Sequence, residues 1–514
     1  MTEDLKGLAL DAIATSGAAD DPDYPRFHVV PPVGRLNDPN GLLVDGGTYH
    51  AFYQFSPFHP DRKLVYWGHS SSTDLLHWRH HEPAIIPDSS YDLSGAYSGN
   101  AIVLEGHELG CAPAQAPYQL FYTGNLKDPV TDERTASQCL VTSNGLTDFT
   151  KWPGNPLIAA HAKGYTAHYR DPQVFRNPDR PGEYRMLLGV QRANETGAAV
   201  LYRSRDLVSW ELEGELSFPD AGGAFDSFGY MWECPGLVRV RDEATGEDWD
   251  VLIWCPQGIT PEREGFENIF PCVYTVGHLV GTELRDTDGT FHEVDRGFEF
   301  YAPQTFARRP SEPGPVLLTA WAGNASEDDQ PSIETGQWVH ALSAPRGLSL
   351  KDGRLIQRPA TDLPHDAGQP ALVGPVSGDG LHDVAELRGH RSWQLRLEAD
   401  PGRTSGAWGL RIGSDKSHVD ITLDGGVLRV DRSASRYTQH GDARTVTLPE
   451  GCAPVLEVLH DRSLTEVFVG DGSVVFTLRS FVDSGSSGAR LMVDGSLVLA
   501  SGSARTFAPT PEGM

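Results

Sequence analysis

Apolar, aromatic-rich segments recur at a nearly constant interval through the first two thirds of the chain. Five such segments begin 65 to 69 residues apart: Tyr49–Phe55, Tyr118–Gly124, Tyr184–Val190, Asp250–Pro256 and Pro315–Trp321. Each has the length and composition of a buried strand, and turn-forming residues separate them. A repeat of this length built from short strands is typical of four-stranded propeller blades, so the pattern predicts a five-bladed β-propeller.

The pattern changes on both sides of this repeat. From residue 376 to 514, apolar and polar residues alternate, as in Trp393–Glu398, which predicts strands with one face in water. The expected fold class is therefore all-β, a five-bladed β-propeller followed by a C-terminal β-sandwich. The expected domains are a lead-in at 1–26 with a short helix from Asp4 to Ile13, a propeller at 27–358, a Pro- and Gly-rich linker at 359–375 and a sandwich at 376–514.

A polar segment precedes each core strand of the repeat. These segments are Asn37–Pro39, Tyr97–Gly99, Arg170–Pro172, Trp232–Pro235 and Tyr301–Gln304. Equivalent positions on the first strand of every blade face the propeller axis, so their side chains are expected to meet there. Three of the five segments carry a carboxylate, which predicts that Asp38, Asp171 and Glu233 converge in one funnel.

Asp38 lies in the most constrained of these segments. Pro39 fixes its own φ and biases Asp38 towards an extended conformation. We expect Asn40 and Gly41 to turn the chain tightly after it. An isolated Asp-Pro-Asn-Gly segment is more often a plain hairpin turn, so the functional interpretation depends on the other two acids.

Three carboxylates in one small space are costly, because like charges raise one another's pKa. Metal binding or acid–base chemistry would justify the cost. A hard cation needs more oxygen ligands, and Arg170 beside Asp171 disfavours one, so no metal and no cofactor are predicted. Two carboxylates that flank a glycosidic bond are the minimum for glycoside hydrolysis. Aromatic residues near these segments could pack on sugar faces or belong to the core: Tyr53, Trp67, Tyr97, Trp232, Tyr301 and Trp321.

Charge and composition limit the kinds of partner that the protein is expected to bind. The 514-residue chain has a net charge of −28, which argues against nucleic acid, and it contains no apolar run long enough to span a membrane. The first residues lack the features of a secretory signal, and the six scattered cysteines are expected to be free thiols in the cytoplasm. The exposed faces of the predicted sandwich could serve a homo-oligomer.

Several motifs resemble one known family in the order in which they occur. Asn37–Gly41, Arg170–Pro172 and Glu233–Pro235 resemble the three signatures of glycoside hydrolase family 32, the invertases and fructanases. The similarity covers about residues 27–480. Gly164–Pro172 and Asp295–Phe298 are most similar to the intracellular bacterial branch, the sucrose and sucrose-6-phosphate hydrolases.

The resemblance implies a propeller with a sandwich and a retaining mechanism without a cofactor. Asp38 would be the nucleophile that forms a fructosyl-enzyme, Glu233 the general acid and base, and Asp171 a ligand of the fructose hydroxyls. The residues implied to bind substrate are Asn37, Gln54, Trp67, Tyr97, Ser98, Arg170 and Trp321. The implied activity is hydrolysis of terminal β-D-fructofuranosides such as sucrose, sucrose-6-phosphate or short fructans.

The chain departs from the family pattern on the leaving-group side. Arg35 occupies a position where the family often has tryptophan, and His59–Lys63 replaces a loop that often carries an aromatic residue. Our hypothesis from the sequence is that Arg35, Arg62 or Lys63 meets a phosphate or further sugar units.

Three alternatives remain open at this stage. A fructosyltransferase or a levan- or inulin-processing enzyme would use the same double displacement with a sugar acceptor. An inverting five-bladed glycosidase would hold its two carboxyl groups further apart. A sugar-binding module would use the pocket without catalysis.

Overall fold

The computed structural model describes residues 4–106, 108, 116–259, 266–326, 329–360, 371–372, 376, 378–439 and 441–507. Most of the predicted linker lies outside these residues, and so does Cys111. The chain begins with helix α1 (Leu5–Ala14), as predicted, and the Asp4 carboxylate caps it by accepting a hydrogen bond from the Gly7 N–H at 2.9 Å. Within the described residues, no helix is both long and apolar enough to cross a bilayer.

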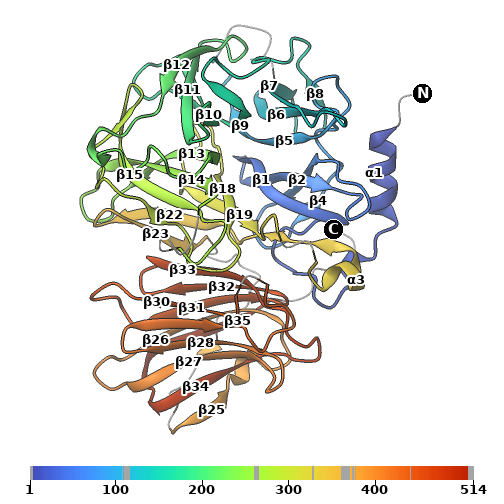
Figure 1. Cartoon of the computed structure of the whole chain (residues 1–514). Coiled ribbons are helices and arrows are strands. Elements are labelled where there is room, and N and C mark those ends of the chain that lie inside the picture. The colour runs from blue at the N-terminus through green and yellow to red at the C-terminus, as the bar shows by residue number, and fades with distance from the viewer. Residues whose placement is uncertain are drawn as a thin grey trace.

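Five sheets form the upper body in Figure 1. Sheet 1 contains β1 (Gly34–Asp45), β2 (Thr48–Ser56), β3 (Tyr66–Ser72), β4 (Arg79–His80) and β20 (Trp338–Val339). Sheet 2 contains β5 (Ala96–Val103), β6 (Tyr118–Lys127), β7 (Arg134–Ser143) and β8 (Phe149–Lys151). Sheet 3 contains β9 (Tyr165–Arg176), β10 (Tyr184–Arg192), β11 (Gly197–Ser204) and β12 (Glu211–Glu215).

Sheets 4 and 5 complete this body. Sheet 4 contains β13 (Met231–Arg241), β14 (Asp248–Gln257), β15 (Val273–Val280), β16 (Glu283–Arg285) and β17 (His292–Glu293). Sheet 5 contains β18 (Tyr301–Thr305), β19 (Leu317–Ala322), β21 (Ala341–Leu342), β22 (Arg346–Lys351) and β23 (Arg354–Pro359). The short helix α3 (Ser332–Gly336) and the 3₁₀ turns η1 (Ala18–Asp20) and η3 (Pro219–Ala221) lie between strands.

The first strands of the five sheets contact one another in a closed cycle, β1 to β5 to β9 to β13 to β18 and back to β1. Strand β20 pairs in parallel with β1, so a late segment of the chain completes the first sheet and joins the ends of the ring. Within these sheets the other strand pairs of the described residues are antiparallel, as a hairpin-connected blade requires. The fold of this part is a β-propeller, as predicted.

Two six-stranded sheets form the lower body in Figure 1. Sheet 6 contains β24 (Ala371–Leu372), β26 (Ser392–Ala399), β31 (Val455–Asp461), β32 (Leu464–Val469), β33 (Val474–Arg479) and β35 (Leu499–Thr506). Sheet 7 contains β25 (Gly380–Asp383), β27 (Ser405–Gly413), β28 (His418–Asp424), β29 (Val427–Asp431), β30 (Ala443–Thr447) and β34 (Ala489–Ser496), and the 3₁₀ turn η4 (Ala385–Leu387) precedes β26. Apolar residues of both sheets share one buried core, so this body is a β-sandwich, as predicted.

The expectation of a tight turn at Asn40 and Gly41 is wrong. Strand β1 runs without interruption from Gly34 to Asp45, and the turn to β2 lies at Gly46–Gly47. Both of these glycines have positive φ, 54° and 79°, as a two-residue hairpin requires. Asn40 and Gly41 instead form a β-bulge, because the side-chain oxygen of Asn40 accepts a hydrogen bond from the Gly99 N–H at 3.2 Å and holds β1 against β5.

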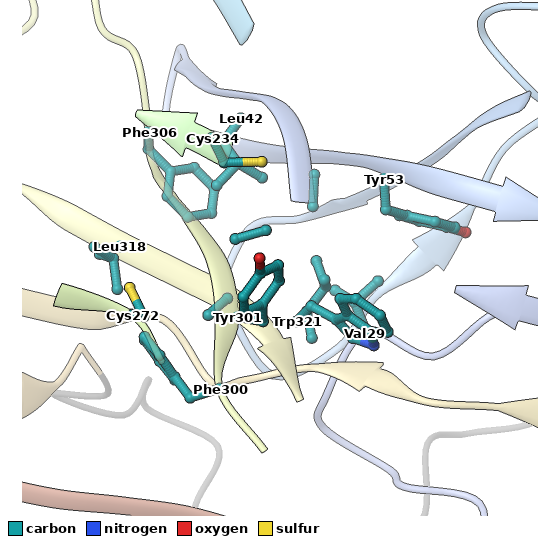
Figure 2. Packing of buried hydrophobic residues seen from close by; sticks show 14 of the residues in the cluster. Val29, Leu42, Tyr53, Cys234, Cys272, Phe300, Tyr301, Phe306, Leu318 and Trp321 are labelled. Atoms are coloured by element: carbon teal, nitrogen blue, oxygen red, sulfur yellow. The ribbon is translucent and has the colours of Figure 1, made fainter. Parts of the chain in front are cut away.

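The largest buried core of the propeller extends from the N-terminal segment to the inner strands of sheets 1, 4 and 5. Figure 2 shows part of it, with Tyr301 and Trp321 close to Val29 and with Cys234 near Leu42. Tyr301 and Cys234 belong to polar segments that the sequence places at the axis. The packed core therefore continues directly into the walls of the site.

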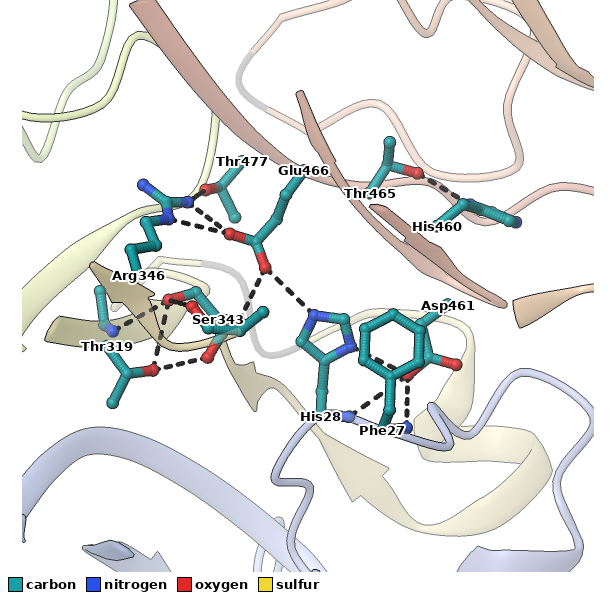
Figure 3. A network of polar contacts seen from close by, with 12 residues as sticks. Phe27, His28, Thr319, Ser343, Arg346, His460, Asp461, Thr465, Glu466 and Thr477 are labelled. Atoms are coloured by element: carbon teal, nitrogen blue, oxygen red, sulfur yellow. Dashed lines mark hydrogen bonds and ion pairs between the residues drawn. The ribbon is translucent and has the colours of Figure 1, made fainter. Parts of the chain in front are cut away.

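Buried ions join the two bodies (Figure 3). Arg346 of sheet 5 is completely buried and contacts Glu466 of sheet 6 at 2.5 Å and Asp295 at 2.9 Å. His28 bridges Asp461 at 2.9 Å and Glu466 at 3.1 Å. Because every charge in this group has an opposite partner within hydrogen-bond distance, the group is satisfied in the absence of water.

Candidate active site

The three predicted acids lie on three of the five inner strands of the ring. Asp38 is on β1, Asp171 on β9 and Glu233 on β13. Each of these strands has a register shift at its acidic segment, and β5 and β18 have one at the equivalent position. Such bulges twist a strand locally and redirect its side chains. Residues at three of the bulges have the left-handed backbone that this demands: Asp171 (φ 64°), Cys234 (φ 46°) and Ala302 (φ 49°).

Asp38 is held by amide and hydroxyl donors. The Asn37 side-chain nitrogen donates to Asp38 Oδ1 at 3.1 Å, and Gln54 Nε2 donates to Asp38 Oδ2 at 3.2 Å. The hydroxyl of Ser98 also donates to Asp38 Oδ2, and Gln54 contacts both Asn37 and Ser98. Three residues that the sequence assigned to substrate binding therefore surround this carboxylate in the absence of substrate.

Cys234 connects Asp38 to Asp171. Its backbone N–H donates to Asp171 Oδ2 at 3.0 Å, and its thiol donates to Asp38 Oδ2 at 3.6 Å. The backbone N–H of Asp171 donates to the Thr123 hydroxyl at 3.0 Å, which fixes the bulge from the neighbouring sheet 2. Hydrogen bonds from a single residue, Cys234, thus link the two aspartates.

Arg170 connects Asp171 to Glu233. Its Nη2 donates to Glu233 Oε1 at 2.6 Å, and its Nε lies 3.8 Å from Asp171 Oδ2. The other oxygen of Glu233 accepts a hydrogen bond from the Tyr301 hydroxyl at 2.6 Å. The structure therefore brings all three predicted acids together, linked through Cys234 and Arg170.

Burial and like charge dominate the electrostatics of the site. Burial raises the pKa of Asp38, the Ser98 hydrogen bond lowers this pKa, and the negative charge of Glu233 raises it. Burial likewise raises the pKa of Asp171 to about 7, against the lowering effect of Arg170 and with further raising by Glu233 and Asp38. The charge of Glu233 therefore affects the pKa of both aspartates. Two carboxyl groups that act on one bond must lie close enough for such an effect.

The aromatic residues assigned to substrate binding differ in exposure. Trp67 is fully buried, and its indole N–H donates to the Tyr97 carbonyl oxygen at 3.0 Å. Trp321 is also buried, and its ring lies edge-on to Tyr301 at 6.1 Å. Tyr97 is half-buried. In this structure, Trp67 positions the backbone next to Ser98, and Tyr97 has a ring that a ligand can reach.

The network also contains Tyr301, Thr123 and His168, to which the sequence assigned no role at the carboxylates. Tyr301 was a candidate only for packing on sugar or in the core, and Thr123 belongs to a core-strand segment of the repeat; the partners of both depend on strand pairing across blades. His168 contacts Arg170 at 2.9 Å and lies in the Gly164–Pro172 motif. Within the described residues, no group of three or more His, Cys, Asp or Glu side chains could hold a metal ion.

The three basic residues of the leaving-group hypothesis differ in their surroundings. Arg35 is buried, and its guanidinium carbon lies 5.3 Å from the Trp321 ring centroid. Arg62 and Lys63 are exposed, and Arg62 lies over the Phe58 ring at 5.7 Å.

Comparison with known proteins adds independent support for the family. The family model "Glycosyl hydrolases family 32 N-terminal domain" matches residues 28–359, and "Glycosyl hydrolases family 32 C terminal" matches residues 373–506. A sucrose-6-phosphate hydrolase from Klebsiella pneumoniae is 36% identical over 90% of this chain and 89% of its own length. One from Bacillus subtilis (strain 168) is 32% identical, with 90% of each chain covered.

Solved structures agree with these relatives. A sucrose-6-phosphate hydrolase from Lactobacillus gasseri superposes with a TM-score of 0.82 at 30% identity, covering 98% of this chain and 96% of its own. The Bombyx mori GH32 β-fructofuranosidase BmSUC1 superposes with a TM-score of 0.78 at 27% identity, covering 98% of each chain. On the family models and the identity over nearly its whole length, the chain belongs to glycosyl hydrolase family 32 and is a glycoside hydrolase that cleaves fructosides.

Proposed function

We propose that this enzyme hydrolyses the fructosyl bond of sucrose and of sucrose-6-phosphate with retention of configuration. The observation that carries the proposal is the linked arrangement of Asp38, Asp171 and Glu233 on inner strands of the ring. The relatives named above are sucrose-6-phosphate hydrolases, and they match nearly the entire chain. A retaining mechanism needs two carboxyl groups that act on the same bond, and the charge of Glu233 acts on Asp38.

In the first step, an Asp38 oxygen attacks C2 of the fructosyl group while the bond from C2 to the bridging oxygen breaks. Glu233 gives its proton to that oxygen, so the leaving sugar departs neutral at this position. The hydrogen bonds to Asp38 from Asn37, Gln54 and Ser98 favour the ionised nucleophile.

In the second step, water attacks C2 of the fructosyl ester, and Glu233 takes the proton of the water as the bond to Asp38 breaks. Positive charge develops on the fructosyl ring in both transition states, and the carboxylates around it stabilise that charge. Asp171 is proposed to hold fructose hydroxyls, because its side chain is fixed by the Cys234 N–H and by Arg170.

The proposal is tested with the purified wild-type enzyme, sucrose and sucrose-6-phosphate. We expect equal amounts of fructose and of the leaving sugar, with the β-anomer of fructose formed first in a time-resolved NMR spectrum. Asp38→Asn and Glu233→Gln should each lower kcat by at least about 10³-fold, whereas Asp61→Asn at an exposed site should not. Retained turnover in either site variant would contradict the assigned roles, and transfer to sugar acceptors in place of water would indicate a fructosyltransferase.

We also propose that the enzyme acts in the cytoplasm and that it could assemble as a homo-oligomer. Five of its cysteines are free thiols in the described part of the chain, which suits a reducing compartment. Cell fractionation and light scattering test the two statements separately.

A further inference from the structure

Three hydrogen-bond donors lie near Glu233 and outside the network that holds Asp38. They are Arg134 at the start of β7, His168 on β9 and Tyr230 just before β13. None of them belongs to the residues assigned above to the fructosyl group. A general acid must reach the bridging oxygen of its substrate, so the leaving group binds next to Glu233. The neighbours of Glu233 on its solvent side are therefore the candidates for contact with the leaving group.

Arg134 extends over the site from the β6–β7 hairpin. Strands β6 and β7 continue beyond the end of β5, and Arg134 pairs with Lys127 at the tip of this extension. The guanidinium carbon lies 6.0 Å from the centroid of the Tyr97 ring. In the described part of the chain, no carboxylate lies within ion-pair distance of Arg134. An unneutralised arginine is notable at this position because the chain has 70 acidic and 42 basic residues.

His168 presents a ring N–H to the same space. Its Nδ1 lies 2.9 Å from Arg170 Nη1, and because arginine can only donate, Nδ1 must accept this hydrogen bond. Burial and the charges of Arg170 and Arg134 lower the pKa of His168 to about 4, so the ring is neutral near pH 7. A neutral ring that accepts at Nδ1 carries its proton on Nε2, where it is available to a ligand.

Tyr230 completes the cluster. Its ring is 40% exposed and lies edge-on to His168 with the ring centroids 6.2 Å apart. Burial and the charge of Glu233 raise the pKa of Tyr230, while Arg170 and Arg134 lower it. The charges of both Glu233 and Arg134 therefore act on the Tyr230 hydroxyl.

We propose that Arg134, His168 and Tyr230 form the leaving-group subsite and that Arg134 binds a phosphate carried by the leaving sugar. This inference rests on the proposed function and identifies the residue that distinguishes a phosphorylated fructoside from a neutral one. The cluster offers a guanidinium, a ring N–H and a phenol hydroxyl, and each of these can donate to an acceptor oxygen of a phosphate. A neutral sugar lacks the negative charge that would pair with the Arg134 guanidinium.

The test compares kcat/KM for sucrose-6-phosphate and for sucrose in the wild type, Arg134→Gln and Arg134→Lys. The ratio of the two values should fall by about 10- to 100-fold in Arg134→Gln, because a charge-assisted contact to phosphate is lost. Arg134→Lys should recover part of the ratio, since it keeps the charge without the planar fork. Inorganic phosphate should inhibit sucrose hydrolysis competitively in the wild type and more weakly in Arg134→Gln. Melting curves establish that the variants are folded.

Arg62→Gln is the matched control, because Arg62 is exposed and is one of the three basic residues that the sequence suggested for a phosphate. It should leave the ratio unchanged. An equal loss on both substrates in Arg134→Gln, or a larger fall of the ratio in Arg62→Gln, would overturn the proposal. A wild-type enzyme that releases fructose from neither substrate would instead overturn the proposed function, and with it this subsite.

Discussion

Asp38 is the residue at which burial and hydrogen bonding act in opposite directions. Burial raises its pKa, and the Ser98 hydroxyl lowers it by donating to the ionised form. A nucleophile must be ionised, so activity should fall as pH drops through the pKa of Asp38 in the free enzyme. The acidic limb of the pH–rate profile therefore reports how well the hydrogen bonds compensate for burial.

Ser98→Ala should move the acidic limb of kcat/KM to higher pH. The substitution removes a donor that favours the ionised carboxylate, so the pKa of Asp38 rises and a larger fraction of the enzyme is protonated at a given acidic pH. The profile is measured from pH 4 to 8 with sucrose. Ser143→Ala provides the control. Ser143 is a buried serine of sheet 2, to which Ser98 also belongs, and its hydroxyl accepts a hydrogen bond from the Leu146 N–H in a turn. An unshifted limb in Ser98→Ala would show that Ser98 does not tune Asp38.

At the scale of the element, side-chain amides join the inner strands of neighbouring sheets. Asn100 of β5 accepts from the Val174 N–H at 2.8 Å and donates to the Val174 carbonyl at 3.1 Å. Gln173 of β9 makes the same pair of contacts with the backbone of Leu237 on β13, at 2.7 and 3.0 Å. Inner strands of different sheets do not share a backbone ladder, so these amides take its place and fix the spacing of the acidic segments.

Asn100→Ala should destabilise the protein by about 2–3 kcal/mol, because it leaves the backbone N–H and carbonyl of the buried Val174 without partners. The free energy of unfolding is measured by urea titration. Asn194→Ala removes an exposed asparagine of the same kind and should change stability by less than about 0.5 kcal/mol. Equal stability of the two variants would show that the amide contacts between sheets contribute little.

At the scale of the whole molecule, the sandwich fixes a segment that leads into the site. The Asp295 and Glu299 carboxylates accept hydrogen bonds from the backbone of β33, at Thr477 (2.9 Å) and Arg479 (2.8 Å). Strand β18 begins two residues after Glu299 with Tyr301, whose hydroxyl holds Glu233. The sandwich thus positions Glu233, the proposed general acid, indirectly, without contributing a side chain to the carboxylate network described above.

Loss of the His28 proton should make the protein less stable at alkaline pH. Burial lowers its pKa, but the hydrogen bonds that His28 donates to Asp461 and Glu466 prevail and raise the pKa to about 9. A histidine whose pKa is higher in the folded state stabilises the fold fully at pH values below its unfolded pKa of about 6.5. This stabilisation is lost as the pH rises from about 6.5 through 9. The free energy of unfolding should therefore fall by up to about 3 kcal/mol over this range through His28.

Denaturant unfolding at several pH values between 6 and 9.5 measures this effect. His28→Gln should be less stable near pH 6.5 and should lose much of the alkaline decline. His161→Gln at an exposed position should keep the slope of the wild type. Identical slopes in the wild type and His28→Gln would contradict the protonated, paired state of His28.

The sequence by itself determined the repeat, the fold class and the identity of the acids. A strand needs only a local run of apolar residues, and its repetition at 65 to 69 residues was enough to predict a ring. Asp38, Asp171 and Glu233 followed from that ring, because equivalent positions face one axis. The local prediction of a turn at Asn40 failed, because the Asn40 side chain binds the backbone of Gly99 in another sheet.

Only the tertiary structure decided how Tyr301 and Arg134 reach the site. Tyr301 reaches Glu233 from 68 residues away along the chain, and Arg134 reaches Tyr97 because the β6–β7 hairpin continues beyond the end of β5. Contacts of this kind depend on blade orientation and on bulges at single residues, which no local pattern encodes. Periodicity fixes where strands occur, whereas the directions of side chains at the axis depend on backbone geometry that forms only when the ring closes.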